Sequence, residues 1–299
     1  MTKTTLRLIG LAVLLAAAAA AGADNAAPER IVVPLSKPGQ PAVIHVDLLF
    51  GAVKITGYEG KDVIVDSKAT AKSVSNWPMP EPVPAPPIPG WTQDKAKEKD
   101  RKDKAAGMKR LSLDNSGLTV EEDNNTVTIE VESFRTGLDL DVKVPFNSNL
   151  KIGGANMNGI SVENVNGEIE IESANGGIKL GNVSGTVVAT TTNGDVDVVL
   201  NKINPDKPMS FATFNGDVDV TLPADVKATV RIKSNMGEVY SDFEIALKQA
   251  PPDTESSPKR EGGKFRVSID RSIYGTINGG GQELKFQNFH GNIYLRKKK

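Results

Sequence analysis

The sequence predicts an all-β protein in which the chain winds into a β-solenoid, a helix-like stack of laps of about 18–22 residues. Three observations support this prediction: a tandem repeat in residues 164–199, alternation of apolar and polar residues within it, and glycine or Asn-Gly at each expected turn. Aromatic residues make up only 5% of the chain, so the core must consist mainly of Val, Ile and Leu. Such side chains suit tightly stacked strands.

The tandem repeat consists of residues 164–181 (NVNGEIEIESANGGIKLG) and 182–199 (NVSGTVVATTTNGDVDVV). At a shift of 18 residues five positions are identical, and apolar residues such as Ile169 and Val187 also coincide. A fixed period is typical of solenoids, in which equivalent residues of successive laps lie above one another. The identical pairs are Asn164/Asn182, Val165/Val183, Gly167/Gly185, Asn175/Asn193 and Gly176/Gly194.

After each turn glycine, apolar and polar side chains alternate with a period of two. This period predicts half-buried strands, because a helix would not place such side chains on one face. We expect Val198→Asp to put a charge inside the stack, and Thr191→Asp, on the other face or in a turn, to cost little stability. The inner face is expected to hold Ile169, Ile171, Ile178, Leu180, Val196, Val198 and Leu200, and the outer face Glu168, Glu170, Glu172, Asp195 and Asp197.

Asparagine and glycine mark the expected turns, because both accept positive φ angles more readily than other residues. Asn-Gly between alternating strands is also a hairpin signal, but a solenoid explains the register of the repeat as well as the turns. The same asparagine amides could bind sugars, and the sequence does not separate that role from a structural one. The expected structural turn residues are Asn164, Gly167, Asn175, Gly176, Asn182, Gly185, Asn193, Gly194, Asn215 and Gly216.

Residues 1–23 have the composition of a secretory signal peptide. Lys3 and Arg7 precede an apolar stretch, residues 8–21, and Ala-Gly-Ala at residues 21–23 is a small-residue cleavage pattern. The apolar stretch is too short to span a membrane well, so we expect no membrane span after cleavage. Loss of the two basic residues changes the formal net charge from −1 to −3, which argues against a nucleic-acid partner.

The sequence contains little that could support catalysis or metal binding. It has no cysteine, which excludes disulfides and thiolate metal sites. Its two histidines, His45 and His290, have no partners at metal-ligand spacing. Motifs for a nucleophile elbow, a phosphate loop and a dinucleotide fold are missing from the sequence. We therefore expect no catalytic residues and no cofactor.

The chain divides into a signal peptide (1–23), an N-terminal β-segment (30–72), an insertion (73–110) and the main β-repeat domain (111–299). The insertion is rich in proline between Trp77 and Trp91, where seven of thirteen residues are proline, and then rich in lysine. A segment of this composition favours an extended, mobile loop outside the sheet. Alternatively, Trp77 and Trp91 with the basic stretch contact an anionic envelope polymer or a protein partner.

Four aspartates form the strongest candidate for chemistry. If their laps are adjacent, the carboxylates lie about one strand spacing, ~4.8 Å, apart, and could bind calcium, which takes oxygen ligands. They could also serve a β-helix polysaccharide lyase. However, each aspartate pair follows its glycine directly into the strand, unlike the calcium-binding nonapeptide repeat, and a solvated outer face is the favoured interpretation. The four are Asp195, Asp197, Asp217 and Asp219.

Several stretches resemble one bacterial family. The Gly-x-Val-x-Ile segment at residues 51–57, the strand ending in Val-Pro at 140–145, the tandem repeat, Ile-Asn-Gly-Gly-Gly at 277–281 and Gly-Asn-Ile-Tyr-Leu at 291–295 are similar to DUF4097, a family of candidate adhesins built from β-strand repeats. The resemblance runs from about residue 40 to the end and departs from the family at the insertion. It implies a non-catalytic envelope or surface protein and offers no catalytic residues.

Together these features predict an exported, non-enzymatic protein of the cell envelope, periplasmic or at the cell surface, acting as a scaffold or adhesion-type binding module. Its expected partner is an envelope polymer, a glycan or a protein. One alternative is a polysaccharide-active enzyme, either lyase or hydrolase, that uses the acidic residues. Another is a structural or sensory subunit of the envelope. The sequence leaves the oligomeric state open.

Overall fold

The computed structural model describes residues 29–69, 117–131, 137–249, 259–261, 264–266 and 272–299. The signal peptide predicted for residues 1–23 lies outside these ranges. So does the insertion predicted for residues 73–110, with Trp77 and Trp91. The described ranges hold no helix with the length and apolar character that a membrane crossing requires.

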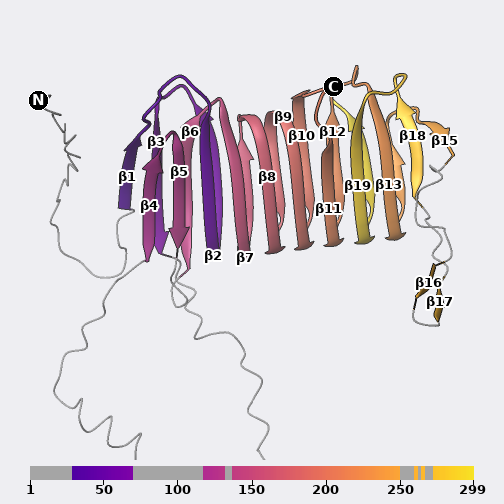
Figure 1. Cartoon of the computed structure of the whole chain (residues 1–299), viewed down its shortest axis with the longest axis horizontal. Helices are drawn as coiled ribbons and strands as arrows, with labels where there is room; N and C mark the ends of the chain where they lie inside the picture. Colours follow the sequence, from indigo (N-terminus) through magenta and orange to yellow (C-terminus); the bar gives the residue numbers. More distant parts are fainter. Residues whose placement is uncertain (1–28, 70–116, 132–136, 250–258, 262–263, 267–271) are drawn as a thin grey trace, which may run out of the picture.

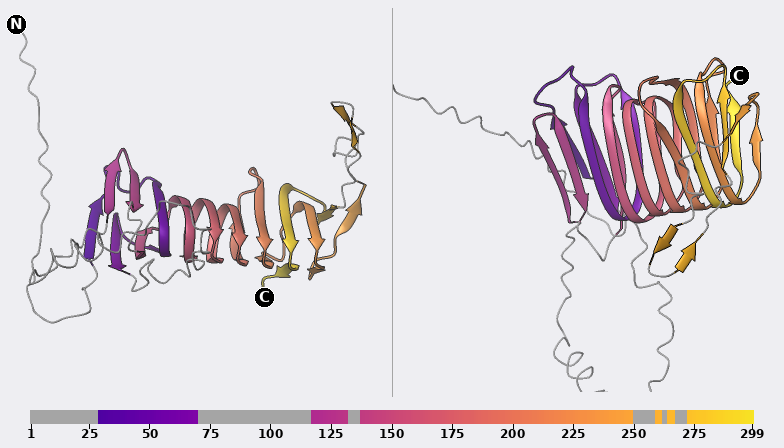
Figure 2. Two further views of the ribbon diagram at one scale, coloured as in Figure 1. Left: turned by 90° about the horizontal axis from the view of Figure 1, so that it is seen from below. Right: turned by 45° about the vertical axis from the view of Figure 1, so that its right-hand side comes forward.

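The described chain forms a long stack of strands in two layers, which we call layer A and layer B (Figures 1 and 2). Each full lap has one strand segment in each layer, and β2, β7 and β9 bend at a corner and contribute to both. Layer A runs in the order β4 (Leu118–Asp123), β5 (Thr126–Val131), β2 (Ala42–Tyr58, first part), β7 (Ser148–Glu163, first part), β8 (Asn166–Asn175), β9 (Ile178–Asn193, second part), β11 (Met209–Asn215), β19 (Gln282–His290), β13 (Ala228–Met236), β18 (Ile273–Ile277) and β15 (Ala246–Lys248).

Layer B lies against layer A and is built from the remaining strand segments. A separate short hairpin is formed by β16 (Lys259–Glu261) and β17 (Lys264–Arg266). Layer B runs in the order β1 (Glu29–Pro34), β3 (Asp62–Ala69), β6 (Leu138–Pro145), the second parts of β2 and β7, the first part of β9, β10 (Val196–Ile203), β12 (Val218–Leu222), β20 (Ile293–Lys297) and β14 (Val239–Ser241).

The tandem repeat pairs with itself in parallel. In layer A, Ile169 is the partner of Val187 and Asn175 is the partner of Asn193. In layer B, Val196 pairs with Ile178 in the same way. Parallel strands need a crossover rather than a tight turn, so the repeat cannot be a hairpin. The register confirms the predicted all-β, solenoid-like fold.

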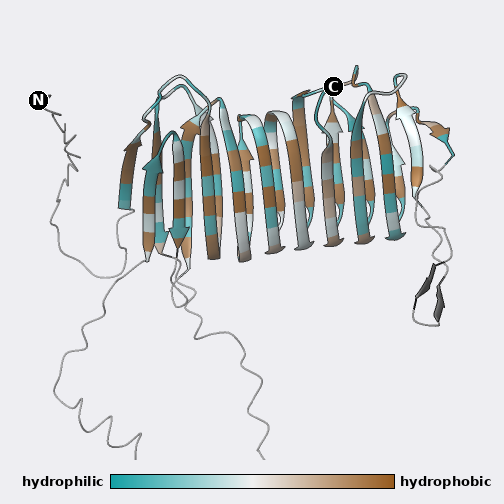
Figure 3. Cartoon of the chain, viewed as in Figure 1, coloured by the Kyte–Doolittle hydropathy of each residue, from teal (hydrophilic) through white to brown (hydrophobic). Residues whose placement is uncertain are grey.

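The core is the space between the two layers, filled by the inward side chains of both. Apolar and polar bands alternate along the strands (Figure 3), and all seven residues predicted for the inner face of the repeat are buried. The expectation for Thr191 is wrong. Its side chain is 2% exposed, because the alternation continues inward from Val187 through Ala189. Its hydroxyl donates to the carbonyl oxygen of Gly176 at 3.0 Å, which satisfies this buried polar group.

The spatial order of laps departs from the chain order at both ends. The β2 lap lies between the β5/β6 lap and the β7 lap. The β19/β20 lap lies between the β11/β12 lap and the β13/β14 lap. Beyond these laps the direction changes: β1, β3 and β4 at one end, and β18 and β15 at the other, pair antiparallel with their neighbours. Such terminal strands cover most of the edges that a parallel stack would otherwise expose.

Candidate functional site

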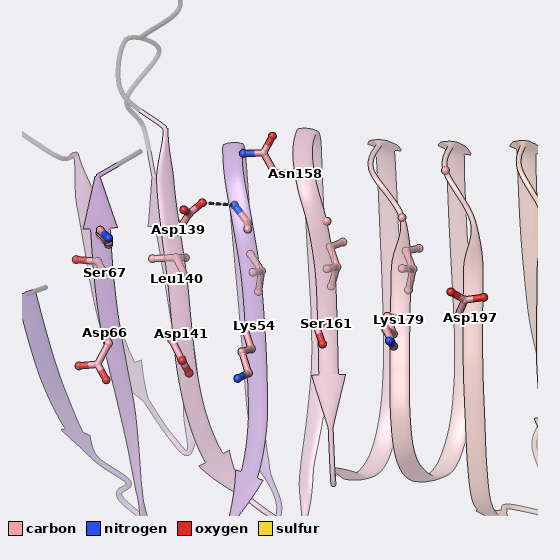
Figure 4. Close-up of a pocket in the computed structure, with 18 of the residues that line it drawn as sticks. Lys54, Asp66, Ser67, Asp139, Leu140, Asp141, Asn158, Ser161, Lys179 and Asp197 are labelled. Carbon is pink, nitrogen blue, oxygen red and sulfur yellow. Dashed lines mark hydrogen bonds between the residues drawn. The ribbon is translucent and has the colours of Figure 1, made fainter. Parts of the chain in front are cut away.

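A groove of about 940 Å³ crosses the outer face of layer B, from β3 through β6, β2, β7 and β9 to β10 (Figure 4). Its floor is low because Gly159, Ser161 and Gly177 lie at its centre and carry small side chains or none. A Cβ atom added at Gly159 would meet nothing nearer than a carbonyl oxygen at 3.7 Å, so the space above this backbone is open. The groove therefore runs along the stack, across the strands.

A row of charged side chains follows the groove. Asp141, Lys54, Ser161, Lys179 and Asp197 occupy matching register positions on five neighbouring strands, and Figure 4 shows them on the same face. Successive members lie about one strand spacing, ~4.8 Å, apart. Among the described residues, neither lysine has a carboxylate within ion-pair distance, so both ammonium groups can reach a ligand. The row reads negative, positive, neutral, positive, negative.

Other charges of the groove already have partners. Arg30 donates two hydrogen bonds to Asp66, from Nε at 2.6 Å and from an Nη at 2.8 Å. These hydrogen bonds lower the pKa of Asp66 below its ordinary value. Asp139 accepts a hydrogen bond from the backbone N–H of Ala52 at 2.9 Å. The Arg30–Asp66 pair and Asp139 line one end of the groove, and the hydrogen bond of Asp139 ties β6 to the backbone of β2 there.

The laps that carry the four candidate aspartates are adjacent, as the prediction required, with Asp197 beside Asp219 in register, but three of the four carboxylates have other partners. Asp195 accepts a hydrogen bond from the backbone N–H of Asp217 at 2.8 Å, and Asp217 accepts one from the N–H of Asn292 at 2.7 Å. Asp219 is held by Nε of Arg296, 2.8 Å from both its oxygens. Two of the four thus hold turns and a third is paired with a cation. The described ranges contain no group of three or more His, Asp or Glu side chains placed to bind a metal ion.

Asp195 and Asp197 both line the groove, and Asp197 belongs to its row of charges. Asp197 lies beside Asp219 in register. Partial burial, followed by the charges of Asp219 and Asp195, raises the pKa of Asp197 above the ordinary value, against the opposing effect of Lys179. The neighbouring carboxylate, Asp219, is itself held by Arg296.

The asparagines of the turns form a ladder along one edge of the stack. The side-chain nitrogens of Asn175, Asn193 and Asn215 each donate to Oδ1 of the asparagine one lap earlier at 2.8 Å, beginning at Asn156. On the opposite edge Asn164 and Asn182 have positive φ angles of 58° and 53°. The ladder thus gives these amides a structural role, because each lap is hydrogen-bonded to the next through them.

The predicted turn glycines also stack on one another. A Cβ atom at Gly185 would lie 2.1 Å from the carbonyl oxygen of Gly167, and one at Gly194 would lie 2.6 Å from the backbone of Gly176. Gly216 stands in the same relation to Gly194, at 2.2 Å. The laps thus approach so closely at these corners that no side chain fits.

Sequence reasoning missed the groove residues Lys54, Ser161 and Lys179. They come together because β2 lies beside β7, although residues 59–147 separate these strands in the chain. No local signal marks them, since each is an ordinary outward residue of its strand. The two histidines stay apart: His45 is on β2 and His290 on β19, with four strands of layer A between them.

The family model described as Toastrack DUF4097 matches residues 98–296, which is most of the stack. The chain belongs to the DUF4097 family. The resemblance drawn from the sequence is therefore confirmed. A search of curated proteins finds no match to this chain.

Three solved structures are also similar to the chain. A candidate cell adhesion protein from Clostridium sporogenes has 11% identity and a TM-score of 0.35, with 91% of this chain and 100% of that chain covered. A candidate adhesin from Bacteroides fragilis has 9% identity and a TM-score of 0.29, covering 91% and 97%. A candidate adhesin from Parabacteroides merdae has 8% identity and a TM-score of 0.22, covering 92% and 98%. At these TM-scores the similarities support no conclusion about this DUF4097 protein.

Proposed function

We propose that this DUF4097 protein is an exported, non-catalytic binding module of the bacterial envelope, and that its layer B groove holds an extended polymer. The composition of residues 1–23 supports export. The observation that carries the proposal is the groove itself, which runs across six strands on the face of a rigid stack. A site of this form suits a long ligand more than a compact one.

The row of charges supports binding of a chain with repeating units. Each lap offers one outward side chain about every 4.8 Å along the stack, so a polymer lying in the groove meets a regular series of charges. Lys54 and Lys179 lie two strands apart with Ser161 between them. Because the backbone beneath is held by lap-to-lap hydrogen bonds, the protein side of the site loses little freedom on binding.

The arrangement favours binding over catalysis. An enzyme site needs an acid, a base and a stabilising group that converge on one reacting atom. Asp195, Asp217 and Asp219 are bound to backbone N–H groups or to Arg296, which leaves Asp197 as the one carboxylate of the four without a hydrogen-bond partner among the described residues.

The test compares binding of the chain from residue 24 onward with binding of two tryptophan variants. Ser161→Trp fills the floor of the groove, whereas Thr221→Trp places the same bulk on the outer face of β12, in layer B but outside the residues that line the groove. With purified envelope polymers and glycan arrays, we expect at least a tenfold loss of affinity in Ser161→Trp and none in Thr221→Trp. Equal affinity of both variants would contradict the groove as the site.

Two further readouts separate the rival functions. Release of shortened polymer during the incubation would identify an enzyme instead of a binding module. Recovery of a protein, without glycan, from envelope extract would favour the structural or sensory subunit. Both variants must first show the unaltered thermal unfolding of the parent chain.

A further inference from the structure

The outer face of layer A carries an uncharged band at β9 and β11. Val188, Ala212 and Phe214 point outward there, and Phe214 is 49% exposed. Its ring stacks on that of Phe289 with centroids 4.7 Å apart and planes 6° apart. Contiguous exposed apolar side chains that are rimmed by polar residues are typical of contact surfaces.

The strands on either side of this band carry opposite charges. The charged outward residues of β4, β5, β2 and β8 are acidic; the basic Lys151 of β7 lies 3.8 Å from Glu170, and Lys207 forms an ion pair with Glu168. On the other side, the charged outward residues of β19, β13 and β15 are basic, with Glu283 as the exception. The acidic residues are Glu121, Asp123, Glu130, Asp47, Glu168, Glu170 and Glu172, and the basic ones are Lys285, Arg231, Lys233 and Lys248.

We infer that layer A binds a second copy of this chain, face to face, about a two-fold axis that runs parallel to the strands over β11. Such an axis reverses the direction of the stack, so the acidic side of each copy meets the basic side of the other. It leaves the direction of the strands unchanged, so Phe214 of each copy meets Phe214 of its partner. A two-fold axis along the stack would instead oppose like charges, which is unfavourable.

The register of layer A fits this axis residue by residue. Glu172, Thr190, Ala212, Gln287 and Lys233 form one row across β8, β9, β11, β19 and β13. Glu172 lies two strands before β11 and Lys233 lies two strands after it. With the axis over Ala212, Glu172 of one copy faces Lys233 of the other, and the pair occurs twice.

The face is large enough for a stable dimer. With the axis over β11, the two copies overlap from β2 to β15, four strands on either side of β11, and these eight strand spacings of about 4.8 Å make the shared face roughly 38 Å long. The seven residues of β11 at about 3.3 Å each add a width of roughly 23 Å. The product, roughly 870 Å², is comparable to the ~800 Å² per partner of a standard interface. In such a dimer the two layer B grooves face outward in opposite directions, so one dimer can bind two polymers.

Analytical ultracentrifugation of the chain from residue 24 onward tests the inference. We expect a dimer that is weakened at least tenfold in each of the single variants Glu172→Lys and Lys233→Glu, because each places like charges at both pairs. A mixture of the two variants forms a heterodimer in which both pairs are again opposite in charge. Its affinity should return to within a few-fold of the parent dimer.

A third variant and a control complete the design. The variant Phe214→Asp should give a monomer, because it puts two carboxylates on the axis. Glu163→Lys makes the same charge change as Glu172→Lys on the exposed outer face of layer B and should leave the dimer intact. A parent chain that is monomeric at all concentrations, or a variant mixture that stays monomeric, would overturn the inference. Neither result bears on the groove, which is tested through Ser161→Trp.

Discussion

The middle laps and the terminal laps of this stack are held together by different means. In the middle, each corner repeats the same residues, with asparagine amides bonded from lap to lap and glycines in close contact. At the ends, antiparallel strands without a repeat motif cover the last laps. The comparison teaches that the repeat specifies how one lap lies on another, and that separate segments specify where the stack stops.

The largest effect should come from a charge in the core of the middle laps. Val198 is 1% exposed, so Val198→Asp buries a carboxylate without a partner and should cost about 4 kcal/mol or more in unfolding free energy. Thr191→Asp should also be costly, about 2–3 kcal/mol, since it removes a buried hydrogen bond. Thr221→Asp, on the outer face of β12 in layer B, is the matched control. Chemical denaturation measures all three, and equal costs would contradict the two faces.

A methyl group at a stacked corner should have the next largest effect. Gly194→Ala combines a φ of 140° with a contact of 2.6 Å to the backbone of Gly176, and we expect a cost of about 3 kcal/mol. Gly39→Ala has a φ of 93° but nothing within 4 Å of the added carbon, so only the backbone strain of about 1 kcal/mol remains. Similar melting temperatures for the two variants would mean that the corners are not tightly stacked.

Removal of one asparagine from the ladder should cost about 1 kcal/mol. Asn193→Ala breaks the hydrogen bonds to Asn175 and Asn215, both 2.8 Å. Asn235, in the terminal β13 lap, looks like a ladder residue in the sequence, but Met236 rather than Asn235 pairs with His290 at this corner. Asn235→Ala should therefore leave the melting temperature unchanged. If Asn235→Ala were the more damaging change, the ladder would not stabilise the middle laps.

The smallest effect concerns pH. Burial and neighbouring carboxylates raise the pKa of Asp197 in the fold, so the fold prefers the protonated form and loses that preference as pH rises through the raised pKa. Asp197→Asn should raise the free energy of unfolding at pH 7 slightly, by roughly a few tenths of a kcal/mol because solvent screens this partly exposed carboxylate, and have no effect at pH 3. Asp66→Asn should do the opposite at pH 7, because Arg30 lowers the pKa of Asp66. Thermal melts from pH 3 to 8 check both signs.

The repeat allowed the parallel register to be predicted, because identical residues 18 apart imply equivalent places in the stack. The inner face followed from alternation, except at Thr191, where a polar side chain is buried beside a carbonyl oxygen that the sequence does not reveal. Strands β12 and β13 follow one another along the chain, whereas the β19/β20 lap lies between their laps in the stack. Backbone pairing of this kind depends on no particular side chain, so it leaves no mark in the sequence.

The groove could not be predicted from the sequence either, because it depends on which strands lie side by side. Ser161 and Gly177 form its floor only because β7 and β9 are flanked by β2 and β10, which bring Lys54 and Asp197 to its sides. Of the four aspartates that the sequence marked, Asp195 and Asp197 line the groove. Asp217 and Asp219 serve a turn and an ion pair. Acidic residues at strand starts do not by themselves distinguish these roles.

The place of the β19/β20 lap has a consequence for how the protein is made. Strands β13 and β14 rest on β19 and β20, yet the ribosome completes them first. Until residues 282–297 emerge, this end of the stack remains unassembled, whatever has already formed upstream. If the chain is exported as proposed, the last segment to cross the membrane is also the one that completes this end of the stack.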